Sequence, residues 1–367
     1  MKKNLIYLSA IFAVTTMAQG KELANYPKVE IVEVEDVNII KEETAFRPSG
    51  YLRIEYKGYG ETEGHGDGLE NSFSDTSVDP SIAQDEWNRG ANNYSRLQTT
   101  FGVQATEKIL LEGRIRDYNN LERDDESKDN SAKDGTETRM RLYYAHNNWL
   151  TSRIEYYNQE NDDQELEYQL RMDLYKNKGA FVEKLVLAPK YYHLFPNSNG
   201  GNYVNAIGAD LEYAGNLPLG IKWDGTLYLD YYFYNQDIIT GSNGNDKEDK
   251  ELVVEWEFYL RRHFELYTGN NYGINLDFEG GYDPYVFRQY DRYGFDSNKN
   301  SYVMKKSKNT YELYGQLAVS ADYRVTENFV TTVGVGAEYR NWDNVNQDSA
   351  SDWRWQPFAY VAMKTTF

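Results

Sequence analysis

From Gly50 onward, the chain repeats one unit: a stretch of about ten residues in which apolar and polar side chains alternate, followed by a polar connection. Successive side chains of a β-strand point to opposite faces, so each stretch has one apolar and one charged face. In residues 252–260, for example, Leu252, Val254 and Trp256 alternate with Val253 and Glu255. The repeat indicates a large sheet whose two faces meet different surroundings.

Fourteen stretches fit this pattern. They are 50–58, 94–105, 109–118, 137–146, 149–158, 165–175, 181–194, 203–213, 221–234, 251–261, 273–287, 309–323, 329–340 and 354–367. We therefore predict an all-β fold, a transmembrane antiparallel up-and-down β-barrel of about 14 strands, within a range of about 12 to 16.

The connections between these stretches fall into two classes. The long ones are 59–93, 119–136, 235–250, 288–308 and 341–353, and the short ones include 106–108, 147–148, 176–179 and 326–328. A soluble β-sandwich would have turns of similar length at both ends. Long connections on one side and short turns on the other are typical of outer-membrane barrels, with the long side outside the cell. An even strand number then places both termini in the periplasm.

The beginning of the sequence has the layout of a secretory signal peptide. Lys2 and Lys3 precede an apolar run that ends in the small residues Ala18 and Gly20. We expect residues 1–20 to be removed, with cleavage after Gly20 favoured over cleavage after Ala18. The run is too short for a membrane helix, which needs about 20 apolar residues.

Residues 21–48 form a separate acidic leader in which valine and glutamate alternate around Val29–Glu35. Its charge density leaves little apolar surface, so we expect a flexible or partner-dependent periplasmic segment before a barrel at 49–367. At the other end, Phe367, Met363, Val361 and Ala359 lie on one strand face. An aromatic at the end of such an apolar row resembles the insertion signal read by the barrel-assembly machinery.

Composition agrees with an exported barrel. Mean hydropathy is -0.78, which a barrel with one polar wall can have while it presents an apolar belt to lipid. The 34 tyrosines supply interfacial rings, including the pairs Tyr143-Tyr144 and Tyr191-Tyr192 near strand ends. Cysteine is absent, which excludes disulfides and thiolate sites, and a net charge of -19 argues against a nucleic-acid partner.

The signal peptide running into Lys21-Glu22, the leader rich in valine and glutamate, the segment Phe46–Tyr51 and the tyrosine-rich strands resemble the fusobacterial major outer-membrane porin family. The resemblance spans the whole chain. It implies a passive channel for small hydrophilic solutes and ions, a homotrimer, and in some members a role in adhesion to host or bacterial surfaces. An adhesin whose barrel only displays surface loops is the alternative.

The polar rows carry two groups of charges. The first is a basic wall, expected to line the lumen, and comprises Arg96, Arg114, Arg116, Arg139, Arg141, Arg153 and Arg171. The second is an acidic wall and comprises Asp210, Glu212, Asp224, Asp230, Glu255, Glu257, Asp277, Glu279 and Glu312. Facing rows of opposite sign would create a field that orients dipolar solutes. Equally, these charges could keep the lumen wet as lateral salt bridges between neighbouring strands.

No other pattern predicts a chemical site. The histidines His65, His146, His193 and His263 are scattered, and only His193 lies near the outer end of its strand and close in sequence to a loop serine, Ser198. We expect a rim histidine there and neither a catalytic residue nor an enzyme.

The acidic loops at Asp124–Glu126 and Asn243–Asp246 lack the spacing of a calcium loop. Gly334 and Gly336 lack the helix of a dinucleotide fold, and we expect them to relieve crowding in a curved sheet. We therefore expect no metal and no cofactor.

Overall fold

The computed structural model describes residues 46–63, 93–121, 135–160, 164–195, 203–297, 300–341 and 353–367. The predicted signal peptide, the predicted leader before Phe46, and most of the 59–93 connection lie outside these residues. The strands are β1 (Ser49–Tyr59), β2 (Tyr94–Gln104), β3 (Ile109–Asn120), β4 (Gly135–Ala145), β5 (Leu150–Gln159), β6 (Gln164–Lys176), β7 (Lys184–Phe195), β8 (Val204–Asn216), β9 (Lys222–Ile239), β10 (Lys247–Thr268), β11 (Tyr272–Arg288), β12 (Arg292–Asp296), β13 (Ser301–Lys306), β14 (Asn309–Thr326), β15 (Phe329–Asn341) and β16 (Trp353–Thr366).

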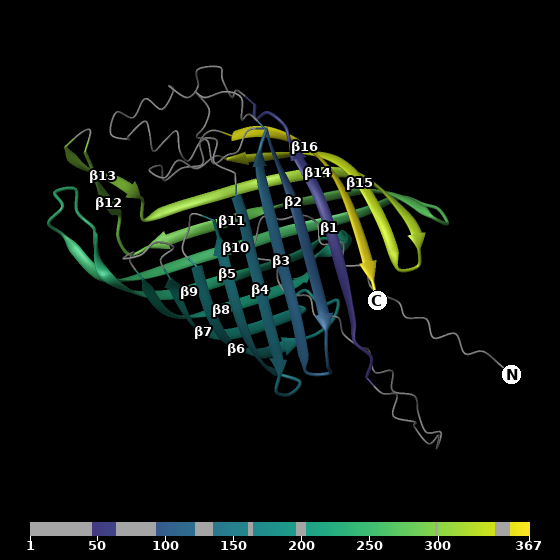
Figure 1. The fold of residues 1–367 in the computed structure, drawn as a ribbon, viewed down its shortest axis with the longest axis horizontal. Helices are drawn as coiled ribbons and strands as arrows, with labels where there is room; N and C mark the ends of the chain where they lie inside the picture. Colours follow the sequence, from purple (N-terminus) through teal and green to yellow (C-terminus); the bar gives the residue numbers. More distant parts are fainter. Residues whose placement is uncertain are drawn as a thin grey trace.

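Fourteen of these strands close into one antiparallel barrel, which confirms the predicted fold class (Figure 1). Neighbours in sequence pair with each other from β1 to β11, β11 continues to β14, and β16 returns to β1. Closure satisfies the backbone hydrogen bonds of every barrel strand, because no edge strand is left. One short 3₁₀-helix, η3 (Pro218–Gly220), lies between β8 and β9. Among the residues described, no helix is both long enough and apolar enough to cross a membrane.

The range 288–308, expected to be a long loop, contains the additional hairpin of β12 and β13. This hairpin joins the sheet through a single pairing between Tyr293 and Ile239 at the end of β9. Its strands of five and six residues are too short for the ten-residue pattern that identified the others. Figure 1 shows the hairpin projecting beyond the barrel, beside the extended ends of β9 and β10.

The two ends of the barrel differ as expected. Short turns close β2–β3, β4–β5, β6–β7, β8–β9, β10–β11 and β14–β15 at the end where β1 begins and β16 finishes. There the amide of Gly50 donates to the carbonyl of Phe367 at 2.9 Å, and the amide of Phe367 donates to the carbonyl of Gly50 at 3.0 Å. The other connections lie at the opposite end.

Period-two alternation separates an exposed apolar row from a buried polar row on the strands. On β10, Leu252 is 39% exposed whereas the neighbouring Glu251 is fully buried. The tyrosine pairs obey the same alternation, so only one ring of each pair can lie on the outer surface: Tyr144 and Tyr191 are exposed, while Tyr143 and Tyr192 are buried inside. The expectation that adjacent tyrosines share the interface is therefore wrong for the buried member.

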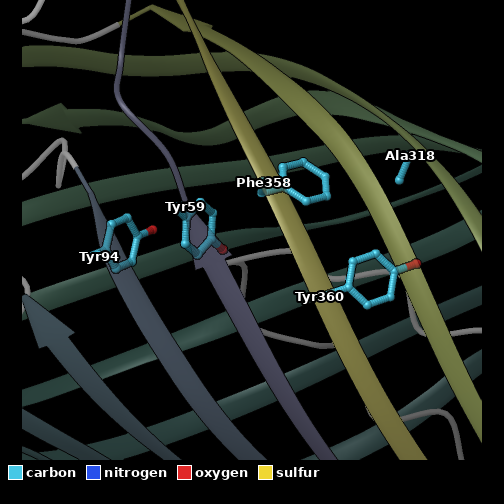
Figure 2. Close-up of a cluster of buried hydrophobic side chains, with 5 residues drawn as sticks. All are labelled: Tyr59, Tyr94, Ala318, Phe358 and Tyr360. Carbon is cyan, nitrogen blue, oxygen red and sulfur yellow. The ribbon is translucent and has the colours of Figure 1, made fainter. Parts of the chain in front are cut away.

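Inward aromatic rings explain the glycines of β15. A Cβ added at Gly334 would lie 2.3 Å from the ring of Tyr360, and one at Gly336 would lie 2.5 Å from Phe358. The two rings point into the barrel together with Tyr59 and Tyr94, which stack on each other with centroids 4.2 Å apart (Figure 2). The glycines therefore do relieve crowding, here between a strand and the rings of its neighbour.

Candidate functional site: the charged barrel interior

The seven arginines predicted to form a basic wall all lie on the buried rows of β2 to β6, and each one is at most 8% exposed. Alternate residues of these strands face outward and are mostly apolar, so period-two geometry turns the arginines inward. A charged side chain buried in a sheet needs a partner of opposite charge. The partners explain how the arginines are arranged.

On β1 to β5, buried glutamates each bridge two arginines. The bridges are Arg53 and Arg96 at Glu55 (2.8 and 3.1 Å), Arg114 and Arg116 at Glu137 (2.5 and 3.4 Å), and Arg141 and Arg153 at Glu155 (2.5 and 3.3 Å). We call these six arginines the arginine arc. Arg153 also pairs with Glu167 of β6. Two guanidiniums therefore share one carboxylate at Glu55 and at Glu137, whereas the two arginines at Glu155 meet a second carboxylate, Glu167.

The nine predicted acidic residues also lie on inward rows. Those that are buried are Asp210, Glu212, Asp230, Glu257, Asp277 and Glu279, and those that are half-buried are Asp224, Glu255 and Glu312. The members on β9 to β14, together with the buried Asp283 of β11, form a second group that we call the carboxylate arc. It comprises Asp224, Asp230, Glu255, Glu257, Asp277, Glu279, Asp283 and Glu312.

In the carboxylate arc the sharing is inverted, because one cation serves several carboxylates. Arg261 pairs with both Asp224 and Glu279. Arg340 of β15 pairs with Glu312 and lies 3.7 Å from the carboxylate of Asp283. In each of these two groups, one arginine is shared by at least two carboxylates.

Tyrosine hydroxyls also donate to carboxylates of this arc. Tyr228 donates to Glu257 at 3.1 Å, and Tyr314 donates to Glu279 at 2.6 Å. Tyr259 donates to Asp283 at 2.8 Å. A neutral donor stabilises a carboxylate without cancelling its charge. These hydroxyls therefore stabilise carboxylates without adding a cation to the arc.

The two predicted walls meet on β6 to β8. Arg171 of the basic wall pairs with Glu212 of the acidic wall at 2.6 Å. Lys190 of β7 pairs with Asp210 at 2.7 Å and with Asp230 at 2.9 Å. Charges of both signs intermingle in this region, so the separation of sign is clear only between the arginine arc and the carboxylate arc.

The order of strands places the two arcs on opposite sides of the barrel. In a ring of fourteen strands, a strand lies opposite the one seven positions away, so β2, β3, β4 and β5 lie opposite β9, β10, β11 and β14. The ion pairs described above link strands that are at most two positions apart in the barrel.

Several of these residues were missed by sequence reasoning. Glu137 lies at the start of its predicted strand and was left out of the charge comparison, and Lys190 lies on β7, which was left out as a whole. Alternation alone would have turned both inward. The tyrosine donors carry no charge, so only the structure identifies their role.

The histidines do not form a catalytic constellation with the described residues. His193 contacts the amide oxygen of Asn205 at 2.7 Å and packs on Phe195, while Ser198 lies outside the described residues, as does His65. The histidine that does meet a serine is His146, whose Nε2 lies 2.7 Å from Ser152 Oγ on the outer surface. In the described part of the chain, no carboxylate is hydrogen-bonded to this ring, and no three metal-ligating groups cluster.

Comparison with known proteins identifies no family for this chain. No family model matches it, and no curated protein matches it. Among solved structures it is similar to a bacterial polysaccharide outer membrane secretin (11% identity, 87% of this chain and 98% of that chain, TM-score 0.39). It is also similar to a loop-deletion mutant of OmpT, an outer membrane protein of Vibrio cholerae (7%, 88% and 98%, 0.34). A third is an anion-selective porin from Comamonas acidovorans (9%, 88% and 99%, 0.31). These TM-scores are too low to support a functional argument.

Proposed function

We propose that this chain forms a passive channel for small hydrophilic solutes and ions across a bacterial outer membrane. The observation that carries the proposal is the closed fourteen-stranded barrel with an exposed apolar row outside and a buried charged row inside. Water-soluble proteins rarely expose so many large apolar side chains, and a bilayer is the environment in which such a surface is stable.

The charged interior is the second part of the proposal. A packed protein core is made of apolar side chains, whereas here Arg, Glu, Asp and Tyr line the inner surface. Charges of this density retain water, and water inside a membrane-spanning barrel provides a path for ions. The side chains cover one another closely, so the path is narrow and suited to small solutes.

Orientation follows from the two ends. The end with long connections faces outside the cell and the end with short turns faces the periplasm, as in other outer-membrane barrels. The exposed row ending at Phe367 serves as the insertion signal for the barrel-assembly machinery, and the partners are membrane lipid, permeating solutes and two further copies of the chain.

Planar-bilayer recording of the purified full-length protein tests the channel. Discrete conductance steps are expected, each ended by closure or loss of one barrel. A correctly folded barrel that inserts and stays electrically silent would refute the channel.

Orientation is tested separately by cysteine labelling, since the natural chain has no cysteine. A cysteine replacing Ser242 in the β9–β10 connection should react with an impermeant maleimide on whole cells. One replacing Asn177 in the β6–β7 turn should react only after lysis. A third, replacing Ser127 outside the described residues, should behave like Ser242. Labelling of Asn177→Cys on intact cells would reverse the assigned direction.

A second candidate function, adhesion, is favoured by the β12–β13 hairpin. It projects beyond the barrel at the end with long connections and exposes Phe295, which is 55% accessible. Replacing residues 294–304 with a short glycine–serine linker should abolish binding to host or bacterial cells and leave conductance intact. Unchanged cell binding would remove the hairpin from any adhesive role.

A further inference from the structure

We propose that residues 29–35 of the predicted leader add a strand to the barrel, along an edge that β10 exposes at the end where the chain enters β1. The interaction goes beyond the channel function and does not depend on it. The edge has unpaired backbone, exposed apolar side chains and a cation, and the leader has groups that match all three.

Closure of the barrel leaves no whole strand unpaired, but β10 extends past its neighbour β9. Arg261, opposite Lys222, is the last residue of β10 to pair with β9, whereas pairing with β11 continues to Thr268. Residues 262–268 thus have a partner strand on one side, and in the described part of the chain no backbone hydrogen bond reaches the other side. A free edge of this kind pairs readily with an added strand.

This extension is the longest at its end of the barrel. On β6 the residues beyond the last pair with β5 are 173–176, and on β14 the residues beyond the last pair with β11 are 324–326. Strand tilt staggers the ends of any barrel by a few residues. The edge of β10 is open over a longer stretch because β9 begins late.

The open edge lies beyond the lipid-facing part of β10. The apolar outward row of this strand runs from Leu252 to Leu260, which matches the roughly 9 to 11 residues of a membrane-spanning strand, and it ends at Arg262. Residues beyond it are exposed on both faces, with Phe264 at 41% and Leu266 at 57%. Apolar side chains on an open edge in water favour a partner that covers them.

The leader has the complementary chemistry. Residues 29–35 are rich in β-branched side chains, which favour strands, and an extended chain places Val32 and Val34 on the same face as Glu30. Arg262 is the matching cation, since no carboxylate of the described residues forms an ion pair with it. The two valines can therefore cover the apolar side chains of β10 while the glutamate pairs with the arginine.

The leader is also long enough to reach this edge. It enters the barrel at Ser49, at the same end as the β10–β11 turn, and β10 lies five positions from β1 in the strand order. Neighbouring strands are about 4.8 Å apart, so the path along the rim is roughly 25 Å. The chain between Glu35 and Ser49 spans up to about 45 Å when extended. Residues 29–35 can therefore reach β10 without any movement of the barrel.

Crosslinking of the mature full-length protein in detergent tests where the leader lies. The natural chain has no cysteine, so Glu33→Cys and Tyr267→Cys can be joined by a short bismaleimide. Tyr323→Cys replaces Tyr267→Cys in the control pair, because Tyr323 is similarly exposed, lies two strand positions nearer to β1 and is paired on both sides. A docked leader should link severalfold more to position 267, whereas a freely moving leader favours the nearer position 323.

Hydrogen exchange measures the added strand itself, because strand pairing protects amides. Deletion of residues 22–44 should make the edge-facing amides of residues 262–268 exchange at least about tenfold faster. Val32→Pro should do the same in the full chain, since proline removes a donor and is not accepted within a paired strand. Thr44→Pro, which lies in the leader but outside residues 29–35, should leave the exchange unchanged.

The results either support the added strand or overturn it. Equal crosslinking at positions 267 and 323 would show a leader that moves freely and would overturn it. Exchange of residues 262–268 that is equally fast with and without the leader would do so too. Exchange that stays slow after the deletion would assign the edge to another occupant, such as a second copy of the chain. Conductance measured on the same variants tests the channel independently, so failure of the added strand leaves the channel standing.

Discussion

The arginine arc and the carboxylate arc solve the same problem, the burial of charge on a barrel wall, with opposite stoichiometry. On β1 to β5 a glutamate is shared by two arginines, and in the carboxylate arc Arg261 and Arg340 are each shared by two or more carboxylates. The inversion does not hold for every buried carboxylate of β9 to β14, because Glu251 of β10 pairs with both Arg288 and Arg292. Tyrosine donors such as Tyr314 appear in the second region, where cations are scarce. A guanidinium has five donors and can satisfy several partners, whereas each carboxylate needs only one cation nearby to be stable. Lateral ion pairs between neighbouring strands therefore follow different patterns in the two arcs.

The largest expected loss of stability comes from replacing a charged residue that two ion-pair partners share. Glu155→Gln deprives Arg141 and Arg153 of their common carboxylate, and Arg340→Gln deprives Glu312 and Asp283 of their common cation. Breaking a buried pair costs about 3 to 5 kcal/mol because uncompensated charge remains. Urea unfolding in detergent micelles should show this loss for both variants.

Acidification distinguishes the two variants. Protonation neutralises carboxylates but not guanidiniums. The Arg340→Gln variant should therefore regain part of its lost stability as the pH falls toward about 4. The Glu155→Gln variant should not regain stability over the same range. Equal responses of the two variants to pH would contradict the inverted stoichiometry.

A smaller loss of stability is expected when the hydroxyl of a tyrosine donor is removed. Tyr314→Phe removes the hydroxyl that donates to Glu279 at 2.6 Å and keeps the ring. A hydrogen bond to a charged group contributes about 1.5 to 3 kcal/mol, so unfolding in micelles should show a loss in that range. Tyr339→Phe is the matched control, because Tyr339 lies on the outer row of β15. If both variants lose the same stability, the hydroxyl of Tyr314 does not support the carboxylate arc.

Much of this fold could be predicted because alternation acts locally. In residues 251–261, apolar and charged side chains alternate along the sequence. The observed strand β10, which contains these residues, has the corresponding apolar and charged faces. The hairpin of β12 and β13 was missed because five or six residues are too short to show a period.

The site was less predictable, because partner choice depends on register. Residue Arg171 belongs to one predicted wall and Glu212 to the other, yet they meet because β6 and β8 both border β7. Spacing along the chain contains no information about that contact. The hydrogen bond from the Tyr228 hydroxyl to the Glu257 carboxylate likewise depends on the pairing of β9 with β10.

Selectivity should respond in opposite directions to substitutions in the predicted acidic wall and in the predicted basic wall. Glutamine or asparagine in place of Glu255, Glu257, Asp277 and Glu279 should lower cation preference, and glutamine in place of Arg114, Arg116, Arg139 and Arg141 should raise it. Reversal potentials in a salt gradient measure both. The unmodified protein should mildly prefer cations, since the predicted acidic wall has more carboxylates than the predicted basic wall has arginines. If neither set moves the reversal potential, these rows do not line the conducting path.

The smallest expected effect is that of salt concentration on the cation preference of the channel. It can be measured without a variant. The Debye length falls from about 10 Å at 0.1 M to about 3 Å at 1 M, so wall charges cease to reach the axis of the lumen. Cation preference should therefore shrink steadily over this range in the unmodified protein. The set with neutralised carboxylates should show a flatter dependence, because less wall charge remains to be screened. A preference that is the same at both salt concentrations would indicate selection by direct contact at a constriction, and the long-range field between the two arcs would then have no part in it.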